Sequence, residues 1–175
     1  AVADAIAVAE GGTQTKLTSG ASSVLANDTD AENNTLTAEV VTSVTNGTLT
    51  LNGNGTFSYT HNGSETTSDS FTYRANDGAL NSNTVTVSIA VTAVNDAPVA
   101  VGQSVLITDE DTALAIQLAG TDADTDSLSF TVVVQPANGT LSGTEPNLAY
   151  TPSANYNGLD SFTFKVNDTT VDSNT

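Results

Sequence analysis

Short runs of alternating apolar and polar residues recur along the whole chain. The clearest run is 85–91, in which Val or Ile stands at every odd position. Alternation with a period of two places the apolar side chains on one face of a β-strand. The first half of the chain contains seven such places, near residues 6–8, 24–25, 36–40, 49–51, 57–59, 71–75 and 85–91. Seven short strands within about 90 residues predict a sandwich of two sheets.

The segment Asn52-Gly53-Asn54-Gly55 separates two of these expected strands. Asn and Gly tolerate the positive φ angles that tight hairpin turns require. We therefore expect strands 49–51 and 57–59 to form a hairpin.

The second half of the chain repeats the first. Asn138-Gly139-Thr140-Leu141 follows Asn46-Gly47-Thr48-Leu49 by 92 residues, and the segment 160–164 follows its counterpart 69–73 by 91. We expect two domains of the same all-β class, at residues 1–95 and 96–175. The segment 171–175 aligns with 80–84, so the second domain has no counterpart of strand 85–91. It should be a sandwich that lacks its last strand and exposes unpaired backbone.

The charge balance narrows the classes of function. Twenty Asp and Glu residues face three Lys and Arg, which gives a formal charge of -17. A nucleic acid partner requires a basic surface, so we expect none. Apolar runs are far shorter than the roughly 20 residues of a membrane span, so we expect no membrane insertion. The absence of Cys excludes disulfides, thiolate metal sites and Cys nucleophiles.

The acidic residues cluster at positions that strand order brings to common ends. Because successive strands run in opposite directions, the residues after the first strand, before the sixth strand and in the linker share one end of the first domain. The residues after the second and sixth strands share the opposite end of the second domain. If the domains stack in chain order, the oxygen ligands at their junction are Glu10, Asp69, Asn95, Asp96, Asp122, Asp124 and Asp168.

These ligands are hard oxygens, and neither thiolate nor imidazole accompanies them, which favours Ca²⁺. Pro98 lacks a backbone N–H and biases Ala97 toward an extended conformation, so the linker should be stiff and non-helical. The same reasoning assigns a weaker set of ligands to the outer ends of the two domains: Asp4, Asp30, Glu32, Asp77, Glu110 and Asp160.

Four segments carry a resemblance to a known family: Val94-Asn95-Asp96-Ala97-Pro98, Asp122-Ala123-Asp124, Asp69-Ser70-Phe71-Thr72-Tyr73 and Asn76-Asp77-Gly78. The chain resembles the cadherin-like and Ig-like tandem repeats of large bacterial surface proteins and adhesins over nearly its whole length. The resemblance implies Greek-key sandwiches in which the linker Asn and Asp, the Asp-x-Asp pair, the Asp after the sixth strand and a basal Glu bind calcium. The first domain departs from the pattern, with Asp30-Ala31-Glu32 and with Ala3 and Ile6 where Asn95 and Pro98 stand later.

From these observations we predict a calcium-rigidified extender repeat of an extracellular adhesin or surface fibre. Its partners are the adjacent repeats of the same chain, and it is no enzyme. His61 is the single histidine, and we expect it to be an ordinary exposed loop residue.

Two alternatives stay open. One is a carbohydrate-binding or accessory module of a secreted enzyme, with Tyr156 as the available aromatic residue. The other is a filament subunit in which a neighbouring copy fills the gap of the second domain by strand addition, with Ala1 to Val8 as the donor.

Overall fold

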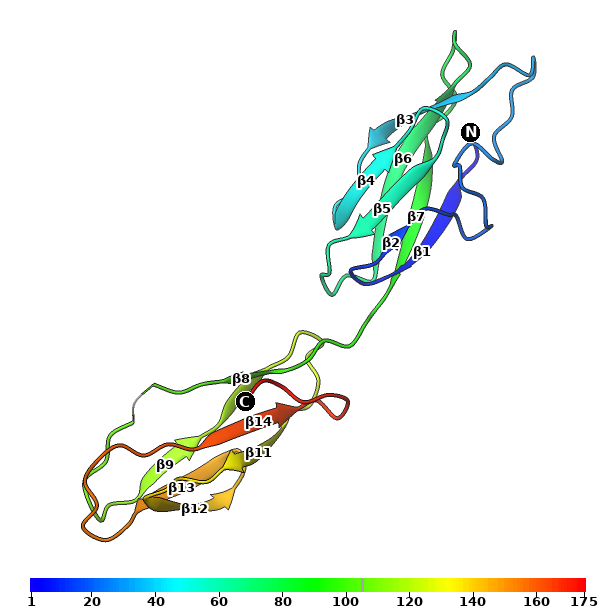
Figure 1. The fold of residues 1–175 in the computed structure, drawn as a ribbon. Coiled ribbons are helices and arrows are strands. Elements are labelled where there is room, and N and C mark those ends of the chain that lie inside the picture. Colours follow the sequence, from blue (N-terminus) through cyan, green and yellow to red (C-terminus); the bar gives the residue numbers. More distant parts are fainter. Residues whose placement is uncertain (105) are drawn as a thin grey trace. The chain divides into compact units, whose positions relative to one another are not determined.

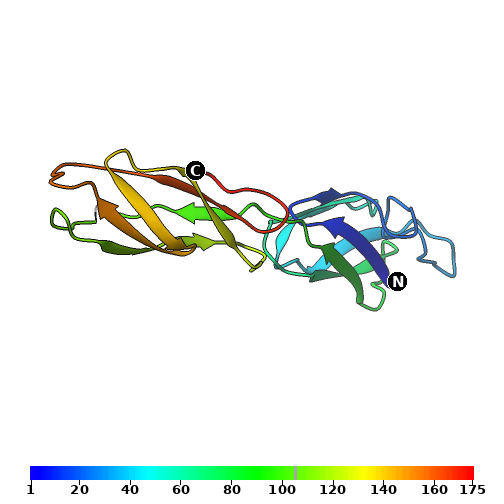
Figure 2. The same cartoon turned by 90° about the horizontal axis from the view of Figure 1, so that it is seen from below.

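The computed structural model describes residues 1–104 and 106–175. The chain divides into two compact units, unit 1 (Ala1–Val94) and unit 2 (Asn95–Thr175). Strands and loops make up both units, and the described residues contain no helix (Figures 1 and 2). The predicted all-β tandem sandwich is confirmed.

The first sheet of unit 1 contains four strands in the order β1-β7-β6-β3 (Figure 1). They are β1 (Asp4–Ala9), β7 (Val85–Thr92), β6 (Ser68–Asn76) and β3 (Thr37–Thr42). β7 lies in the middle, parallel to β1 and antiparallel to β6. It is therefore hydrogen-bonded along both of its edges.

The second sheet of unit 1 has the order β2-β5-β4, with β2 (Thr13–Gln14), β5 (Phe57–His61) and β4 (Gly47–Leu51). The expected hairpin joins β4 and β5, with Gly55 at φ 82°. The strand expected to end at residues 24–25 is barely formed. It consists of the two residues of β2 and an isolated bridge between Ser23 and Thr56.

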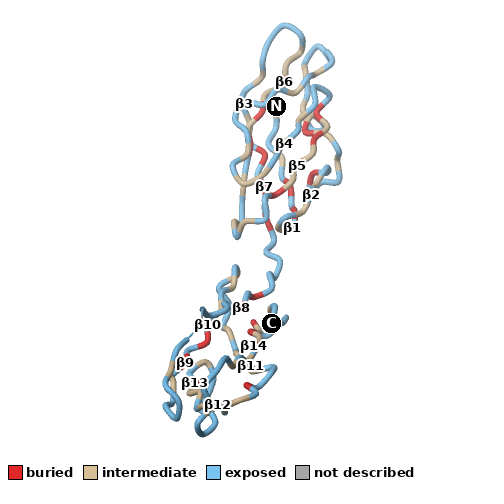
Figure 3. The backbone as a smooth tube through the Cα atoms, turned by 60° about the vertical axis from the view of Figure 1, so that its left-hand side comes forward, coloured by how far each residue is buried: buried red, intermediate tan, exposed pale blue. Residues whose placement is uncertain are grey.

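The apolar residues of the alternating runs meet between the two sheets of unit 1. Figure 3 shows the buried residues as short stretches along the strands. The buried cluster is Ile6, Val8, Leu17, Val24, Phe57, Tyr59, Phe71, Tyr73, Val87, Ile89 and Val91. β7 supplies three of these residues, so the last strand of unit 1 is a substantial part of its core.

Unit 2 has a smaller core and shorter sheets. Its strands are β8 (Val99–Val101), β9 (Leu114–Gln117), β10 (Ala119–Thr121), β11 (Ser129–Val134), β12 (Gly139–Thr144), β13 (Asn147–Pro152) and β14 (Thr163–Asn167). They form the sheets β12-β13-β9, β10-β8 and β11-β14. The buried apolar residues are Ala100, Ile116, Leu118, Leu148, Phe164 and Val166.

The strand that corresponds to β7 is missing from the described part of unit 2, as the sequence predicts. β14 is the counterpart of β6, yet it pairs only with β11, whereas β6 pairs with both β3 and β7. On its other edge β14 has no partner strand among the described residues, only the bridge between Asn167 and Asp172 and the backbone hydrogen bond from Ser173 to Val166.

Candidate metal centre

Five of the predicted ligands gather at one end of unit 2, and we call this group the acidic end. Its members come from three separate segments: the residues before β8, the loop after β10 and the loop after β14. They are Asn95, Asp96, Asp122, Asp124 and Asp168. Two hydrogen bonds connect the segments. The Asn95 side-chain amide donates to Asp168 Oδ2 at 2.9 Å, and the backbone N–H of Asp96 donates to Asp124 Oδ2 at 2.7 Å.

Asp168 is held in place most firmly. Its side chain is buried, with 1% of the residue exposed, and Oδ1 accepts hydrogen bonds from the backbone N–H groups of Thr170 and Val171 at 2.6 Å each. Backbone donation from Val171 and the Asn95 amide hold the pKa of Asp168 below its ordinary value. Asp168 is therefore ionised at neutral pH.

Asp122 has one oxygen atom that no group of the described residues satisfies. Its Oδ1 accepts from the backbone N–H of Asp126 at 3.2 Å, but Oδ2 is buried and has no hydrogen-bond partner among the described residues. An unpaired buried carboxylate oxygen is costly, because it has lost water without gaining another donor. A bound cation would satisfy it, so the acidic end fits a hard metal ion.

Unit 1 offers a second pair of carboxylates, at Glu10 after β1 and Glu65 after β5. Glu10 Oε2 accepts from the backbone N–H of Val94 at 3.3 Å, while Glu10 Oε1 is buried without a hydrogen-bond partner among the described residues. One carboxylate oxygen of Glu10 and one of Glu65 lie within 4.8 Å of each other. Glu65 was missed from the sequence, although strand order places the β5–β6 connection at the same end as Glu10.

Asp69 lies before β6 as expected, but its carboxylate already has four protein donors. Oδ1 accepts from the backbone N–H groups of Thr45 (3.1 Å) and Ser70 (2.8 Å). Oδ2 accepts from the backbone N–H of Asn46 at 2.8 Å and from the Tyr59 hydroxyl at 3.0 Å. A carboxylate has about four lone-pair positions, so little capacity for a metal remains.

Asp160 repeats this arrangement in unit 2. It accepts hydrogen bonds from the backbone of Ala137, Asn138 and Ser161, and from the Tyr150 hydroxyl at 2.8 Å. Asp160 and Asp69 therefore fasten corresponding loops. With four protein donors each, neither carboxylate has much capacity left for a metal ion.

At the opposite end of unit 1, the structure brings Asp4 to Asp28. The Tyr73 hydroxyl lies 3.2 Å from Asp4 Oδ2 and 3.0 Å from Asp28 Oδ2. Burial raises the pKa of Asp4. Asp28 was not among the predicted ligands, and Gly120 stands at its counterpart in unit 2.

Of the other predicted ligands of this end, Asp30 and Asp77 bond to their own loops and Glu32 is exposed. Asp30 Oδ1 accepts from the backbone of Glu32 and Asn34, and Asp77 Oδ1 accepts from the backbone of Ala79 and Leu80. Glu110, in unit 2, is exposed in the loop before β9. Calcium binding by these residues stays a prediction.

The expectation for His61 was wrong. It is the last residue of β5 and is 2% exposed. Its Nδ1 lies 3.3 Å from the backbone N–H donors of both Gly11 and Gly63, and its Nε2 lies 2.9 Å from Thr66 Oγ1. Because Nδ1 accepts, the proton of the neutral ring resides on Nε2 and is donated to Thr66. His61 thus ties the β1–β2 turn to the loop that contains Glu65.

The strand order and the buried cores of the two units define a class of all-β tandem sandwich repeats. The family model described as the bacterial cadherin-like domain matches residues 1–93, and the one described as the bacterial Ig domain matches residues 95–175. The chain belongs to the bacterial cadherin-like domain family. Domains of these two families are typically extracellular, non-enzymatic structural modules. In the described residues, no helix has the length and apolar character to cross a membrane.

Comparison with individual proteins agrees on the fold. The chain resembles the human CDH23 EC21-23 structure with a TM-score of 0.59 and 14% identity over 98% of this chain and 64% of the other. For the human mucin-like protocadherin EC1-2 the TM-score is 0.51, with 17% identity over 96% and 86% of the two chains. In sequence, 66 residues are 42% identical to integrin beta-like protein A of Dictyostelium discoideum. That match covers 36% of this chain and 3% of the integrin-like protein.

Proposed function

We propose that this chain is a calcium-binding spacer of an extracellular adhesin or surface fibre. Ca²⁺ is held by carboxylates on either side of the peptide bond between Val94 and Asn95, and the bound ions restrict how the two repeats orient. The residues in this proposal are Glu10, Glu65, Asn95, Asp96, Asp122, Asp124 and Asp168.

The observation that carries the proposal is the buried, unpartnered Oδ2 of Asp122 within the acidic end of unit 2. Neither of the two salt bridges between described residues reaches it. Arg74 pairs with Glu39 and Lys165 pairs with Asp172, so both of these cations are engaged elsewhere. Ca²⁺ takes six to eight oxygen ligands, including carboxylates and amide carbonyls, and the acidic end contains groups of both kinds.

Covalent connection links the two sets of ligands. The backbone N–H of Val94 bonds to Glu10 in unit 1, and the next residue, Asn95, bonds to Asp168 in unit 2. The residue that contacts Glu10 and the residue that contacts Asp168 are therefore consecutive in the chain. A cation that engages either group fixes the backbone beside this peptide bond, which supports a stiffening role.

The test is a calcium titration of the 175-residue chain, read by calorimetry and small-angle scattering. A cation that binds only the folded chain raises its melting temperature. At a free cation concentration of 100 times the dissociation constant, the free energy of unfolding increases by about 2.7 kcal/mol. We expect saturable binding, a higher melting temperature and a narrower distribution of maximum dimensions with Ca²⁺ than with chelator.

Two controls separate a specific site from general screening of the charge of -17. Sodium chloride at matched ionic strength should not reproduce the effect, and Mg²⁺ should act more weakly because it demands stricter octahedral geometry. Equal melting temperatures and equal dimensions with calcium and with chelator would contradict the proposed function.

A further inference from the structure

His61 is buried in unit 1 beside the two segments that carry the acidic residues Glu10 and Glu65. It ends β5, where it follows Phe57 and Tyr59 on the inward face of the strand. A buried polar side chain lowers stability unless its hydrogen bonds are satisfied, and an apolar residue at this position would avoid that cost. The contacts of the ring therefore indicate why a histidine is present.

One ring nitrogen of His61 holds the turn that follows Glu10. Nδ1 accepts a hydrogen bond from the backbone N–H of Gly11 at 3.3 Å, and the backbone N–H of His61 donates to the carbonyl of Gly12 at 3.0 Å. Glu10 itself donates its backbone N–H to the carbonyl of Thr92, in β7, at 2.9 Å. The backbone of Glu10 is thus fastened by β7 on one side and by His61 on the other.

The same ring holds the loop that contains Glu65. Nδ1 also accepts from the backbone N–H of Gly63 at 3.3 Å, and Nε2, which carries the proton of the ring, lies 2.9 Å from Thr66 Oγ1. The hydroxyl of Ser64 lies 3.1 Å from the same Thr66 oxygen. Glu65 stands between these two hydroxyl residues, so the ring fixes the part of the loop from which its side chain extends.

The two fastened segments bring two carboxylates together. One oxygen of Glu10 and one of Glu65 lie within 4.8 Å of each other, and Glu10 Oε1 is buried without a hydrogen-bond partner among the described residues. Two carboxylates this close repel each other, so the surrounding hydrogen bonds hold them together against that repulsion. A cation that meets a preformed pair does not have to order the two segments, and its affinity is higher for that reason.

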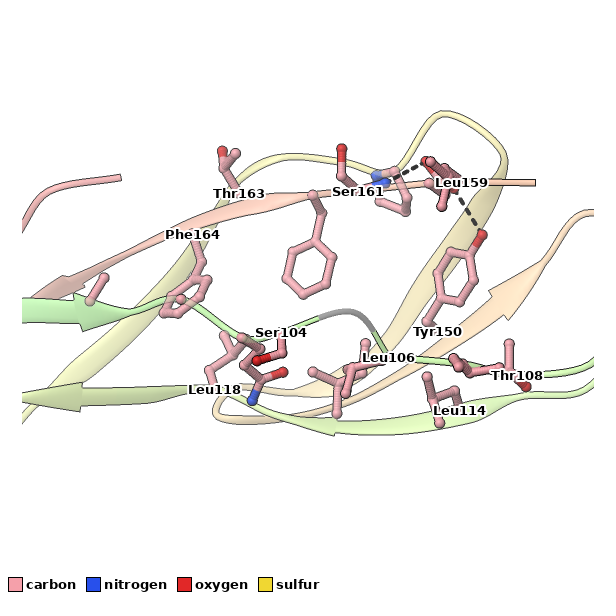
Figure 4. Close-up of a pocket in the computed structure, with 18 of the residues that line it drawn as sticks. Ser104, Leu106, Thr108, Leu114, Leu118, Tyr150, Leu159, Ser161, Thr163 and Phe164 are labelled. Carbon is pink, nitrogen blue, oxygen red and sulfur yellow. Dashed lines mark hydrogen bonds between the residues drawn. The ribbon is translucent and has the colours of Figure 1, made fainter.

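The corresponding loop of unit 2 contains neither a histidine nor a carboxylate. Pro152 is the counterpart of His61, because each lies opposite the glycine of the repeated Asn-Gly-Thr motif, and Tyr156 is the counterpart of Glu65. The neighbouring tyrosine is kept, since the Tyr150 hydroxyl bonds to an aspartate as that of Tyr59 does (Figure 4). Histidine and glutamate therefore occur together in one unit and are replaced together in the other.

We propose that His61 is a positioning residue for cation binding by Glu10 and Glu65. It holds the β1–β2 turn and the β5–β6 loop so that both carboxylates engage one divalent cation. This inference rests on the proposed calcium-binding function and names the buried residue on which binding in unit 1 depends. His61 does not bind the ion itself, because Nδ1 faces two backbone donors and Nε2 carries a proton.

The substitution Thr66→Val tests the inference and leaves the histidine and both glutamates in place. It removes the hydroxyl that His61 contacts and keeps the branched shape of the side chain. Thr66→Ser is the conservative variant, because it retains a hydroxyl. Thr13→Val is the matched control, since it removes the contact of 2.8 Å between the hydroxyls of Thr13 and Thr60 elsewhere on β5. The melting temperature of each variant in chelator verifies that it is folded.

A calcium titration of the whole 175-residue chain, followed by amide NMR, reads the two groups of ligands separately. The amides of Glu65 and of Val94, which donates to Glu10, report on unit 1. The amides of Thr170 and Val171, which donate to Asp168, report on the acidic end of unit 2.

We expect Thr66→Val to weaken the calcium affinity reported in unit 1 about fivefold, the equivalent of one lost hydrogen bond. The affinity reported at the acidic end should fall less. Thr66→Ser and Thr13→Val should both stay within about twofold of the parent.

Other results would overturn the inference. Parent-like affinity of Thr66→Val in unit 1 would mean that His61 does not position the pair, and the proposed function would stand. Equal losses in Thr66→Val and Thr13→Val would mean a general loosening of β5. If the unit 1 amides of the parent do not respond to calcium, the glutamate pair binds no ion. If the amides of the acidic end do not respond either, the proposed function fails with the inference.

Discussion

The Tyr59 hydroxyl donates a hydrogen bond to Asp69 Oδ2 at 3.0 Å, and this pair fastens two parts of unit 1 that are not adjacent in sequence. Tyr59 lies in β5, while Asp69 also accepts from the backbone of Thr45 and Asn46 in the β3–β4 connection. The pair Tyr150 and Asp160 repeats the contact in unit 2 at 2.8 Å. A structural role in both units explains the repeated Asp-Ser-Phe-Thr segment without a metal.

The Asp69→Ala substitution should therefore destabilise unit 1 whether or not calcium is present. It removes four hydrogen bonds to a charged acceptor, and we expect a loss of about 2–4 kcal/mol in the free energy of unfolding. Tyr59→Phe removes one of the four and should cost about 1 kcal/mol. Denaturant unfolding with calcium and with chelator measures both, and a loss confined to the calcium condition would show that Asp69 is a metal ligand instead.

Acid should weaken the same contacts. Partial burial acts to raise the pKa of Asp69, but hydrogen bonds from Thr45, Asn46 and Ser70 outweigh it and lower the pKa below the ordinary value of 3.8. The folded chain thus binds this proton less readily than the unfolded chain. The contribution of ionised Asp69 to the free energy of unfolding is complete above about pH 4. It is lost as the pH falls through the lower pKa of the folded chain.

Asp4 should show the opposite dependence. Burial raises its pKa, so the folded chain takes up this proton at a higher pH than the unfolded chain, and stability gains as the pH falls toward the folded pKa. In chelator, Asp4→Asn should flatten the gain in stability that develops as the pH falls toward 3.8, the ordinary pKa of this group. Asp69→Asn is the control, because it should change the dependence only below about pH 4. An unchanged slope in Asp4→Asn would contradict the assignment.

Replacement of His61 should loosen one end of unit 1. His61 Nδ1 accepts from the backbone N–H groups of Gly11 and Gly63, so His61→Leu leaves two donors without their acceptor. We expect a loss of about 2–3 kcal/mol and faster hydrogen exchange at these two amides. The exchange at Gly55, in the β4–β5 hairpin, should not change. Uniform acceleration at all three glycines would indicate global destabilisation in place of the local one.

The alternating pattern predicted most of the fold because burial on one face forces a period of two. The same pattern indicates a buried His61, because His61 follows Phe57 and Tyr59 at a spacing of two and faces inward with them. The assignment to a loop rested on the neighbouring Asn62-Gly63, which is a turn, but one that begins only after the strand has ended. The poorly formed strand near residues 24–25 was weak in sequence as well.

The ends of the units could be predicted, but the directions of the side chains could not. Strand order places Asp69 and Glu10 by their connections, yet it does not reveal that Asp69 faces Asn46 and Tyr59. The repeated Asn-Gly-Thr motif is visible in the sequence, but the reason for its glycine is a tertiary contact that the sequence does not reveal. A Cβ atom at Gly47 would lie 2.8 Å from the Tyr59 ring, so only glycine allows this close approach.

Asp122→Asn provides the sharpest separation of metal binding from folding. Because Asp122 Oδ2 has no hydrogen-bond partner among the described residues, neutralising Asp122 should leave the melting temperature in chelator unchanged or higher, as repulsion within the acidic end decreases. Calcium affinity should fall at least about tenfold, which corresponds to about 1.4 kcal/mol of binding free energy. Asp126→Asn removes the same charge from an exposed neighbour whose contact to Asp122 is through its backbone, so it should retain most of the affinity. Calorimetric titration of both variants distinguishes the cases, and equal losses of affinity would mean that calcium senses the net charge of the loop and does not coordinate Asp122.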